Sequence, residues 1–194
     1  MRIIAGSAGG TIIKAPKGFD VRPTPDLVRQ AIFNSLGDRV IDTRVIEFFA
    51  GTGALSLECL SRGGTSAVCV ELSGYHAGFI RQNLAGARLP VSAMDIRVQD
   101  TFAAITQLAK AGQQFDLIFA DPPYGNKNVG KRSTSFAQQM LDSSDLLKIL
   151  VPGGLFILGH TKRDTLSFPD EWKEKKMLKH GDTVIRFLQM VEKV

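Results

Sequence analysis

The chain has 194 residues, of which 44% are hydrophobic, and its formal net charge is +5 at pH 7. This composition fits one globular domain of ordinary size and excludes a disordered chain, while the positive charge favours a polyanionic partner. No apolar run reaches the roughly 18–20 residues of a membrane span, and the N-terminal residues lack the apolar run of a secretory signal, so we expect a cytoplasmic protein without a membrane segment. The three histidines lack metal-ligand spacing, so we expect no metal.

The first forty residues predict an extension made of a hairpin and a helix. Two strand-like runs, residues 2–5 and 11–14, are separated by glycines, as in a small hairpin. Thr24 is expected to cap a helix that has Pro25 at its first position and that ends at Gly37. We therefore divide the chain into an extension, residues 1–40, and a main domain, residues 41–194.

From residue 44 onward, strand patterns and helix patterns alternate. The expected strands are 45–49, 67–70, 96–98, 115–120, 155–158, 175–178 and 184–190, and the expected helices are 54–62, 74–87, 102–111 and 136–150. Such alternation with short connections predicts an α/β fold, a doubly wound Rossmann-like sheet of about seven strands. The last two strands, joined at Gly181-Asp182, predict an antiparallel hairpin.

A glycine-containing loop joins the first expected strand of the main domain to a helix. Gly51 and Gly53 let the backbone turn sharply and approach a nucleoside-type cofactor. The third glycine of the dinucleotide fingerprint is replaced by Ser56, and Glu71 can accept from a ribose diol of either NAD or S-adenosylmethionine. Glu47 favours S-adenosylmethionine, because a carboxylate attracts a methionine ammonium group and repels a pyrophosphate. NAD and a purely structural turn are the alternatives.

The sequence Asp121-Pro122-Pro123-Tyr124 directly follows the expected strand 115–120. The prolines stiffen the turn, so that the Asp121 carboxylate and the Pro122 carbonyl can accept from one exocyclic amino group. Two such hydrogen bonds localise the nitrogen lone pair for attack on a sulfonium methyl, while Tyr124 offers a face for base stacking. The motif predicts methyl transfer to a base amine; a rigid loop that only ends a strand is the alternative.

With these motifs the sequence resembles the bacterial 16S ribosomal RNA guanine-N2 methyltransferases of the RsmD type over nearly its whole length. The resemblance includes the glycine loop, Glu71 and the Asp-Pro-Pro-Tyr motif, which many amino-methyltransferases share. More specific are Arg2-Ile3-Ile4-Ala5-Gly6 and Arg22-Pro23-Thr24, the latter followed by Asp26, Arg29 and Phe33-Asn34. The resemblance implies a class I methyltransferase fold, S-adenosylmethionine as cofactor and the 16S rRNA of a small-subunit particle as partner, and we expect a monomer.

The resemblance also implies residue roles. Glu47, Gly51 and Gly53 would hold the methionine end of the cofactor, Glu71 the ribose hydroxyls and Asp100 the adenine amino group. The other expected cofactor-binding residues are Phe49, Ala50, Leu72, Thr101, Phe102 and Asp121, and the target pocket would comprise Asp121, Pro122, Pro123 and Tyr124. In two places the chain departs from the family, which often has Asp where Glu47 stands and, in many members, Phe where Tyr124 stands.

The polar, basic segment 125–133 predicts a surface loop that closes over a flipped base or clamps a phosphate. The residues that we expect at the RNA are Arg2, Arg22, Thr24, Lys127, Lys131 and Arg132, with a merely solvated surface as the alternative. Two other functions stay open for the whole chain. One is a DNA adenine-N6 or cytosine-N4 methyltransferase, and the other is a non-catalytic RNA-binding or assembly protein with a methyltransferase fold.

Overall fold

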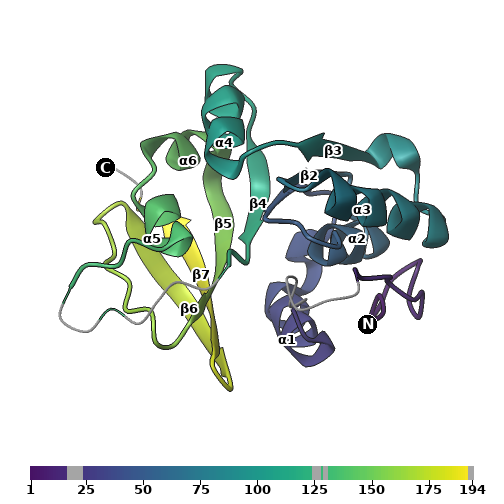
Figure 1. Cartoon of the computed structure of the whole chain (residues 1–194), viewed down its shortest axis with the longest axis horizontal. Helices are drawn as coiled ribbons and strands as arrows, with labels where there is room; N and C mark the ends of the chain where they lie inside the picture. Colours follow the sequence, from purple (N-terminus) through teal and green to yellow (C-terminus); the bar gives the residue numbers. More distant parts are fainter. Residues whose placement is uncertain (17–23, 124–127, 129–130, 192–194) are drawn as a thin grey trace. The chain divides into compact units, whose positions relative to one another are not determined.

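The computed structural model describes residues 1–16, 24–123, 128 and 131–191. These residues belong to two compact units, Met1–Ala104 and Ile105–Val194 (Figure 1). The first unit therefore includes the N-terminal forty residues. No helix in the described ranges is long and apolar enough to cross a membrane, and the cytoplasmic location stays a prediction.

Three parallel strands form the sheet of the first unit. In spatial order they are β3 (Met94–Val98), β2 (Ser66–Glu71) and β1 (Arg44–Phe48). Helices α2 (Ala54–Ser61) and α3 (Gly74–Gly86) follow β1 and β2 and pack against these strands (Figure 1). These strands are largely apolar, as is typical of a parallel sheet whose faces are covered by helices. A short 3-10 turn, Val91–Ala93, precedes β3.

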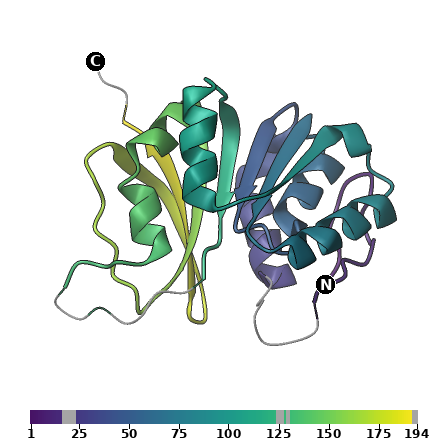
Figure 2. The same cartoon turned by 45° about the horizontal axis from the view of Figure 1, so that its top comes forward.

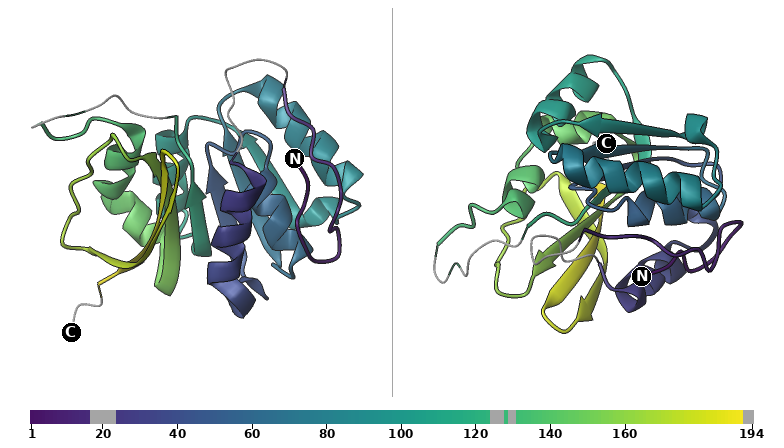
Figure 3. Two further views of the ribbon diagram at one scale, coloured as in Figure 1. Left: turned by 90° about the horizontal axis from the view of Figure 1, so that it is seen from below. Right: turned by 45° about the vertical axis from the view of Figure 1, so that its right-hand side comes forward.

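The N-terminal residues pack against helices of the first unit. The expected hairpin is present as a short antiparallel pairing, with a bridge between Arg2 and Ile12 and backbone hydrogen bonds from Ile3 N to Thr11 O, from Gly10 N to Ile3 O and from Ile13 N to Met1 O. The segment lies beside α3 in both views of Figure 3. Helix α1 (Asp26–Leu36) continues into a 3-10 turn, Gly37–Val40. The prediction that Thr24 caps α1 is wrong: Pro25, whose extended ψ of 150° keeps it outside the helix, takes the cap position and makes no side-chain cap hydrogen bond.

The second unit contains a mixed sheet of four strands. Their order is β4 (Phe115–Ala120), β5 (Leu150–Thr161), β7 (Thr183–Met190) and β6 (Trp172–His180). Strands β4 and β5 are parallel, whereas β7 runs antiparallel to both β5 and β6, which confirms the expected terminal hairpin. Helices α5 (Phe136–Leu141) and α6 (Ser144–Ile149) pack against β5 (Figure 2). Helix α4 (Thr101–Lys110) crosses the boundary between the units.

Two expectations for the second unit are wrong in detail. The helix expected over 136–150 is broken into α5 and α6, because the Ser143 side chain accepts a hydrogen bond from the Leu146 amide and starts a new helix. The strand expected over 155–158 is longer, since β5 continues through Pro152-Gly153-Gly154. A register shift between Phe115 and Leu117 of β4 accommodates these residues, and Gly153, with a φ of 78°, supplies the unusual backbone of the bulge.

Candidate functional site

The loop between β1 and α2 has an unusual backbone. Three of its residues have positive φ angles: Phe49 at 55°, Gly51 at 54° and Gly53 at 72°. A positive φ is uncommon for a residue such as Phe49, and such strained conformations concentrate at functional sites. At Gly53 a Cβ atom would lie 2.8 Å from Cγ2 of Ile80 on α3, so glycine is required there for both space and conformation. Ala50 and Thr52 are buried.

Glu47 lies at the end of β1 and is directed at the start of α2. Its Oε2 accepts a hydrogen bond of 2.8 Å from the Ser56 amide, and Oε1 accepts one of 3.4 Å from the Leu55 amide. Gly53, the residue at the N-terminal cap position of α2, has no side chain to cap the helix, so Glu47 serves as a cap from β1. Glu47 is only 5% exposed, and burial raises the pKa of its carboxyl from 4.5 to about 7 despite these hydrogen bonds.

The raised pKa of Glu47 predicts a pH dependence of stability. Its folded-state pKa of about 7 lies above the ordinary value of 4.5, so this group stabilises the fold below the ordinary pKa and loses that contribution as the pH rises through 7. The difference corresponds to about 3 kcal/mol of unfolding free energy. Urea unfolding between about pH 5 and pH 8 should show a steeper decline for the wild type than for Glu47→Gln, which cannot ionise. Equal declines would contradict this role of Glu47.

Glu71 ends β2 and connects the glycine loop to α3. Its Oε2 accepts from the Gly51 amide at 2.8 Å, its Oε1 accepts from the Ser73 amide at 2.9 Å, and His76 Nδ1 lies 3.5 Å from Oε1. Each carboxylate oxygen has two lone pairs, so Glu71 can still accept from a ligand hydroxyl. It is 8% exposed and lies at the carboxyl end of the strand, where ligands of parallel sheets bind.

Exposed apolar side chains adjoin this carboxyl end. Leu72 is 71% exposed and Val98, at the end of β3, is 50% exposed. Asp100 is exposed and directly precedes α4. Its Oδ1 caps the helix by accepting from the amides of Phe102 and Ala103 at 3.0 and 2.9 Å. The neighbouring Thr101 is buried and Phe102 is half-buried. Apolar faces beside carboxylate acceptors suit a nucleoside, which has a flat ring and several donors.

In the second unit, Asp121 follows the last residue of β4 and lies against β5. A Cβ atom added at Gly159 of β5 would be 2.4 Å from Asp121 Oδ1 and 3.0 Å from its Cγ. The missing side chain of Gly159 therefore makes room for the Asp121 carboxylate. Asp121 is half-buried, Pro122 is buried and Pro123 is exposed, while Tyr124 lies outside the described residues.

The expected RNA-binding residues fall into three groups. Arg2, Lys131 and Arg132 are exposed, and Thr24 is half-buried. Within the second unit, Nη2 of Arg132 forms an ion pair with Oδ1 of Asp142 at 2.7 Å. Arg22 and Lys127 lie outside the described residues. In the ranges that the structure describes, no group of three or more His, Cys, Asp or Glu side chains could hold a metal ion.

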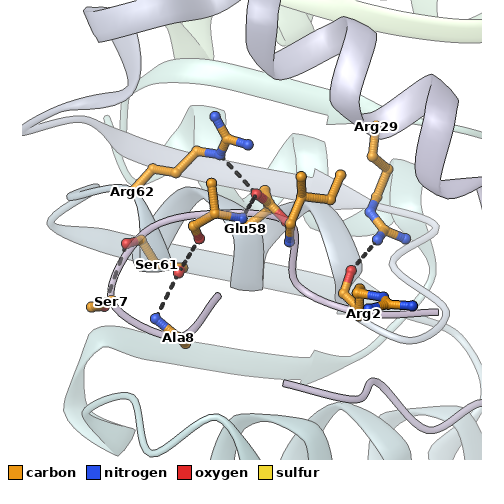
Figure 4. Close-up of polar contacts among 9 residues, drawn as sticks. Arg2, Ser7, Ala8, Arg29, Glu58, Ser61 and Arg62 are labelled. Atoms are coloured by element: carbon orange, nitrogen blue, oxygen red, sulfur yellow. Dashed lines mark hydrogen bonds and ion pairs between the residues drawn. The ribbon is translucent and has the colours of Figure 1, made fainter. Parts of the chain in front are cut away.

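Sequence reasoning named Arg29 only as part of a motif and did not single out Glu58 or Asn83, yet all three are buried polar residues that organise the first unit. Glu58 is fully buried on α2 and accepts from the Ile4 and Ala5 amides, and Arg29 donates to the Arg2 carbonyl (Figure 4). Asn83 is 3% exposed on α3. A usable signal existed for Asn83, because it is a polar residue on a helix face that otherwise carries Ala77, Ile80 and Leu84.

Comparison with known sequences gives one family match and several relatives. The sequence model of the family described as conserved hypothetical protein 95 matches residues 1–189. A Bacillus subtilis protein, YlbH, which is provisionally named an rRNA methyltransferase, is 34% identical over 148 residues, or 76% of this chain and 80% of that protein. The ribosomal RNA small subunit methyltransferase D of Escherichia coli is 35% identical over 124 residues, which are 64% of this chain and 60% of that protein.

Solved structures match nearly the whole chain. The E. coli protein yhhF, provisionally named a methyltransferase, has a TM-score of 0.78 and 25% identity, with 98% of this chain and 97% of that chain covered. An RNA methyltransferase from Salinibacter ruber, solved with S-adenosyl-L-homocysteine, has a TM-score of 0.63 and 15% identity over 89% of this chain and 96% of that chain. Together with the strands described above, these matches confirm the predicted fold class, a Rossmann-like class I methyltransferase fold.

Proposed function

Because the chain belongs to the family described as conserved hypothetical protein 95, we propose that it transfers a methyl group from S-adenosylmethionine to the exocyclic N2 amine of a guanine in 16S rRNA. The substrate in this proposal is the RNA of a small-subunit particle. The observation that carries the proposal is the Asp121-Pro122-Pro123-Tyr124 sequence at the end of β4, with the Asp121 carboxylate lodged against Gly159. The E. coli relative named small subunit methyltransferase D supports the choice of rRNA.

We assign the cofactor to the glycine loop and the carboxyl ends of β2 and β3 in the first unit. S-adenosylmethionine supplies an electrophilic methyl group on a positively charged sulfur. Glu71 would accept from the ribose hydroxyls, and the exposed Leu72 side chain would pack against the adenine ring. Asp100 would accept from the adenine amino group. The methionine end would lie at the loop that contains Phe49, Gly51 and Gly53, all three with positive φ angles.

The role of Glu47 toward the cofactor is less direct in this proposal. Its carboxylate caps α2, so it would act on the methionine ammonium group mainly through its negative charge. Burial raises the pKa of this carboxyl to about 7, so its charge grows as the pH rises through neutrality. The proposal therefore includes tighter cofactor binding above neutral pH than below it.

We assign the target amine to Asp121 and the Pro122 carbonyl. A guanine N2 nitrogen is a poor nucleophile because its lone pair is delocalised into the ring. Hydrogen bonds from its two N–H groups to two fixed acceptors localise that lone pair. The N2–methyl bond forms as the methyl–sulfur bond breaks, the neutral sulfide leaves without an acid, and the proton that N2 then loses passes to its acceptor Asp121. Catalysis then rests on alignment and fixed electrostatics. Lys131 and Arg132 are exposed downstream of this motif and would contact RNA phosphates.

Methyl transfer from tritiated S-adenosylmethionine tests the proposal. The protein is incubated in parallel with unmodified small-subunit particles, naked 16S rRNA and DNA, and labelled RNA is digested to nucleosides. We expect label in rRNA as N2-methylguanosine. Label in DNA with none in RNA would overturn the proposal in favour of a DNA amino-methyltransferase. If calorimetry shows no binding of S-adenosylmethionine at millimolar concentration, a non-catalytic RNA-binding protein is favoured instead.

A further inference from the structure

One buried amide joins the glycine loop to the N-terminal segment. Asn83 on α3 is 3% exposed. Its Oδ1 accepts from the Lys14 amide at 2.8 Å, and its Nδ2 donates to the Lys14 carbonyl at 2.9 Å and to the Thr52 carbonyl at 3.1 Å. Both N–H groups of the side chain are therefore used, one on each segment. Thr52 lies between Gly51 and Gly53, the two glycines of the proposed cofactor site.

We propose that Asn83 is a positioning residue that couples the cofactor loop to the N-terminal segment, so that binding at the loop orders the segment and docking of the segment tightens the loop. This inference rests on the proposed function only in taking the glycine loop as the cofactor site. It adds a regulatory link within that site: a partner that engages the N-terminal residues would alter cofactor affinity.

The loop has further contacts with α3, which make the coupling physically direct. Gly53 packs against Ile80, one turn before Asn83. Glu71 accepts from the amides of both Gly51 and Ser73, and Ser73 caps α3 by accepting from the His76 amide. A ligand that fixes the loop therefore also restrains the helix that carries Asn83.

The other part of the N-terminal segment is fixed to α2, the helix that begins at the glycine loop (Figure 4). Glu58 accepts from the amides of Ile4 and Ala5 at 2.7 and 3.0 Å and from Arg62 Nε at 2.7 Å. Ser61 Oγ accepts from the Ala8 amide at 2.9 Å. The segment is thus held by α2 near residues 4–8 and by α3 at Lys14, and only the second attachment reaches the loop backbone through one side chain.

Thermodynamic linkage makes the coupling reciprocal. A single neutral hydrogen bond contributes modestly, so we expect loss of the Thr52 contact to weaken cofactor binding about tenfold. The Lys14 amide is a direct reporter of the segment, because its hydrogen is bonded to Asn83 Oδ1. Its exchange with solvent should slow when the loop is occupied.

The experiment measures amide hydrogen exchange by NMR, with and without S-adenosylhomocysteine, and the affinity of that ligand by calorimetry. In the wild type we expect exchange at Lys14 to slow by at least about fivefold on ligand binding, the lower bound of typical coupling. Asn83→Asp keeps an acceptor for the Lys14 amide but removes both donors. It should bind the ligand about tenfold more weakly and lose the ligand-induced slowing at Lys14.

Ser61→Ala is the matched control. It removes the hydrogen bonds of the Ser61 hydroxyl with the Ala8 amide and with the Ala5 carbonyl and leaves Asn83 intact, so exchange at Ala8 should accelerate while ligand affinity and the response at Lys14 remain. The coupling is overturned if the wild type binds S-adenosylhomocysteine with no change at Lys14, or if Asn83→Asp binds it as tightly as the wild type. If the wild type does not bind S-adenosylhomocysteine at all, both the proposed cofactor site and the coupling are overturned. That outcome is distinguishable from the other two, in which the wild type binds the ligand.

Discussion

Replacing Asp121 with alanine is expected to lower kcat for methyl transfer about a thousandfold. Its carboxylate is the charged acceptor that the proposed mechanism directs at the substrate amine, and removing one preorganised group that acts on the transition state typically costs a factor of about 10²–10³. Dissociation constants for S-adenosylhomocysteine should change by less than about threefold, because the proposed mechanism directs the Asp121 carboxylate at the substrate amine and not at the cofactor. Single-turnover kinetics on unmodified small-subunit particles, paired with calorimetry, separates the two effects.

Asp121→Asn is the appropriate companion variant. It retains the size of the side chain, which lies against Gly159 of β5, but replaces one acceptor oxygen by a donor that opposes the amine. We expect its kcat to be about a hundredfold below that of the wild type, which is a smaller loss than in the alanine variant. If Asp121→Ala retained more than a tenth of the wild-type rate, Asp121 would have no place in the mechanism.

The fold class could be predicted from the sequence because local patterns repeat along it. The apolar run Phe115–Ala120 was predicted as a strand and forms β4 in the structure. The turn at Gly181-Asp182 correctly predicted the antiparallel pair β6–β7. The family resemblance rested on the N-terminal motifs, the glycine loop, Glu71 and the Asp-Pro-Pro-Tyr motif. It is confirmed by the family match over residues 1–189 together with the relatives named small subunit methyltransferase D. Local patterns failed where tertiary contacts decide, as at Pro152-Gly153-Gly154, which reads as a stop but lies within β5.

The site was predicted less completely, for a physical reason. Motifs identify residues that a ligand touches, but they do not show where a side chain is directed. Glu47 was expected at the methionine end of a cofactor, a role that stays a prediction, and the structure shows its carboxyl as a cap on α2. Asn83 was not predicted as part of the site, because its partners Lys14 and Thr52 are 69 and 31 residues away along the chain. Its hydrogen bonds follow from the packing of α3, which spacing alone does not reveal.

The glycine of the N-terminal motif Arg2-Ile3-Ile4-Ala5-Gly6 allows the segment to pack closely against the backbone of α2. Gly6 has a φ of 82°, and a Cβ atom there would lie 1.8 Å from the Ser61 carbonyl oxygen and 2.3 Å from its carbonyl carbon. Since those atoms belong to the backbone of α2, no side-chain rotation relieves the clash. The Ser7 amide donates to the same oxygen at 2.7 Å. A side chain at position 6 would therefore detach the segment from α2.

Gly6→Ala is accordingly expected to destabilise the protein strongly, and Gly10→Ala provides the control. Gly10 has a similar φ of 86° but no atom within 4 Å of the added Cβ, so it isolates the cost of a left-handed backbone, about 1–2 kcal/mol. Overpacking against rigid backbone adds about 3 kcal/mol at Gly6. Urea unfolding followed by circular dichroism measures both variants. Equal destabilisation would mean that the N-terminal segment is not held against α2. A larger loss in Gly6→Ala, with faster amide exchange at Ile4 and Ala5, would show that the motif's glycine is needed to dock the segment on Glu58 and Ser61.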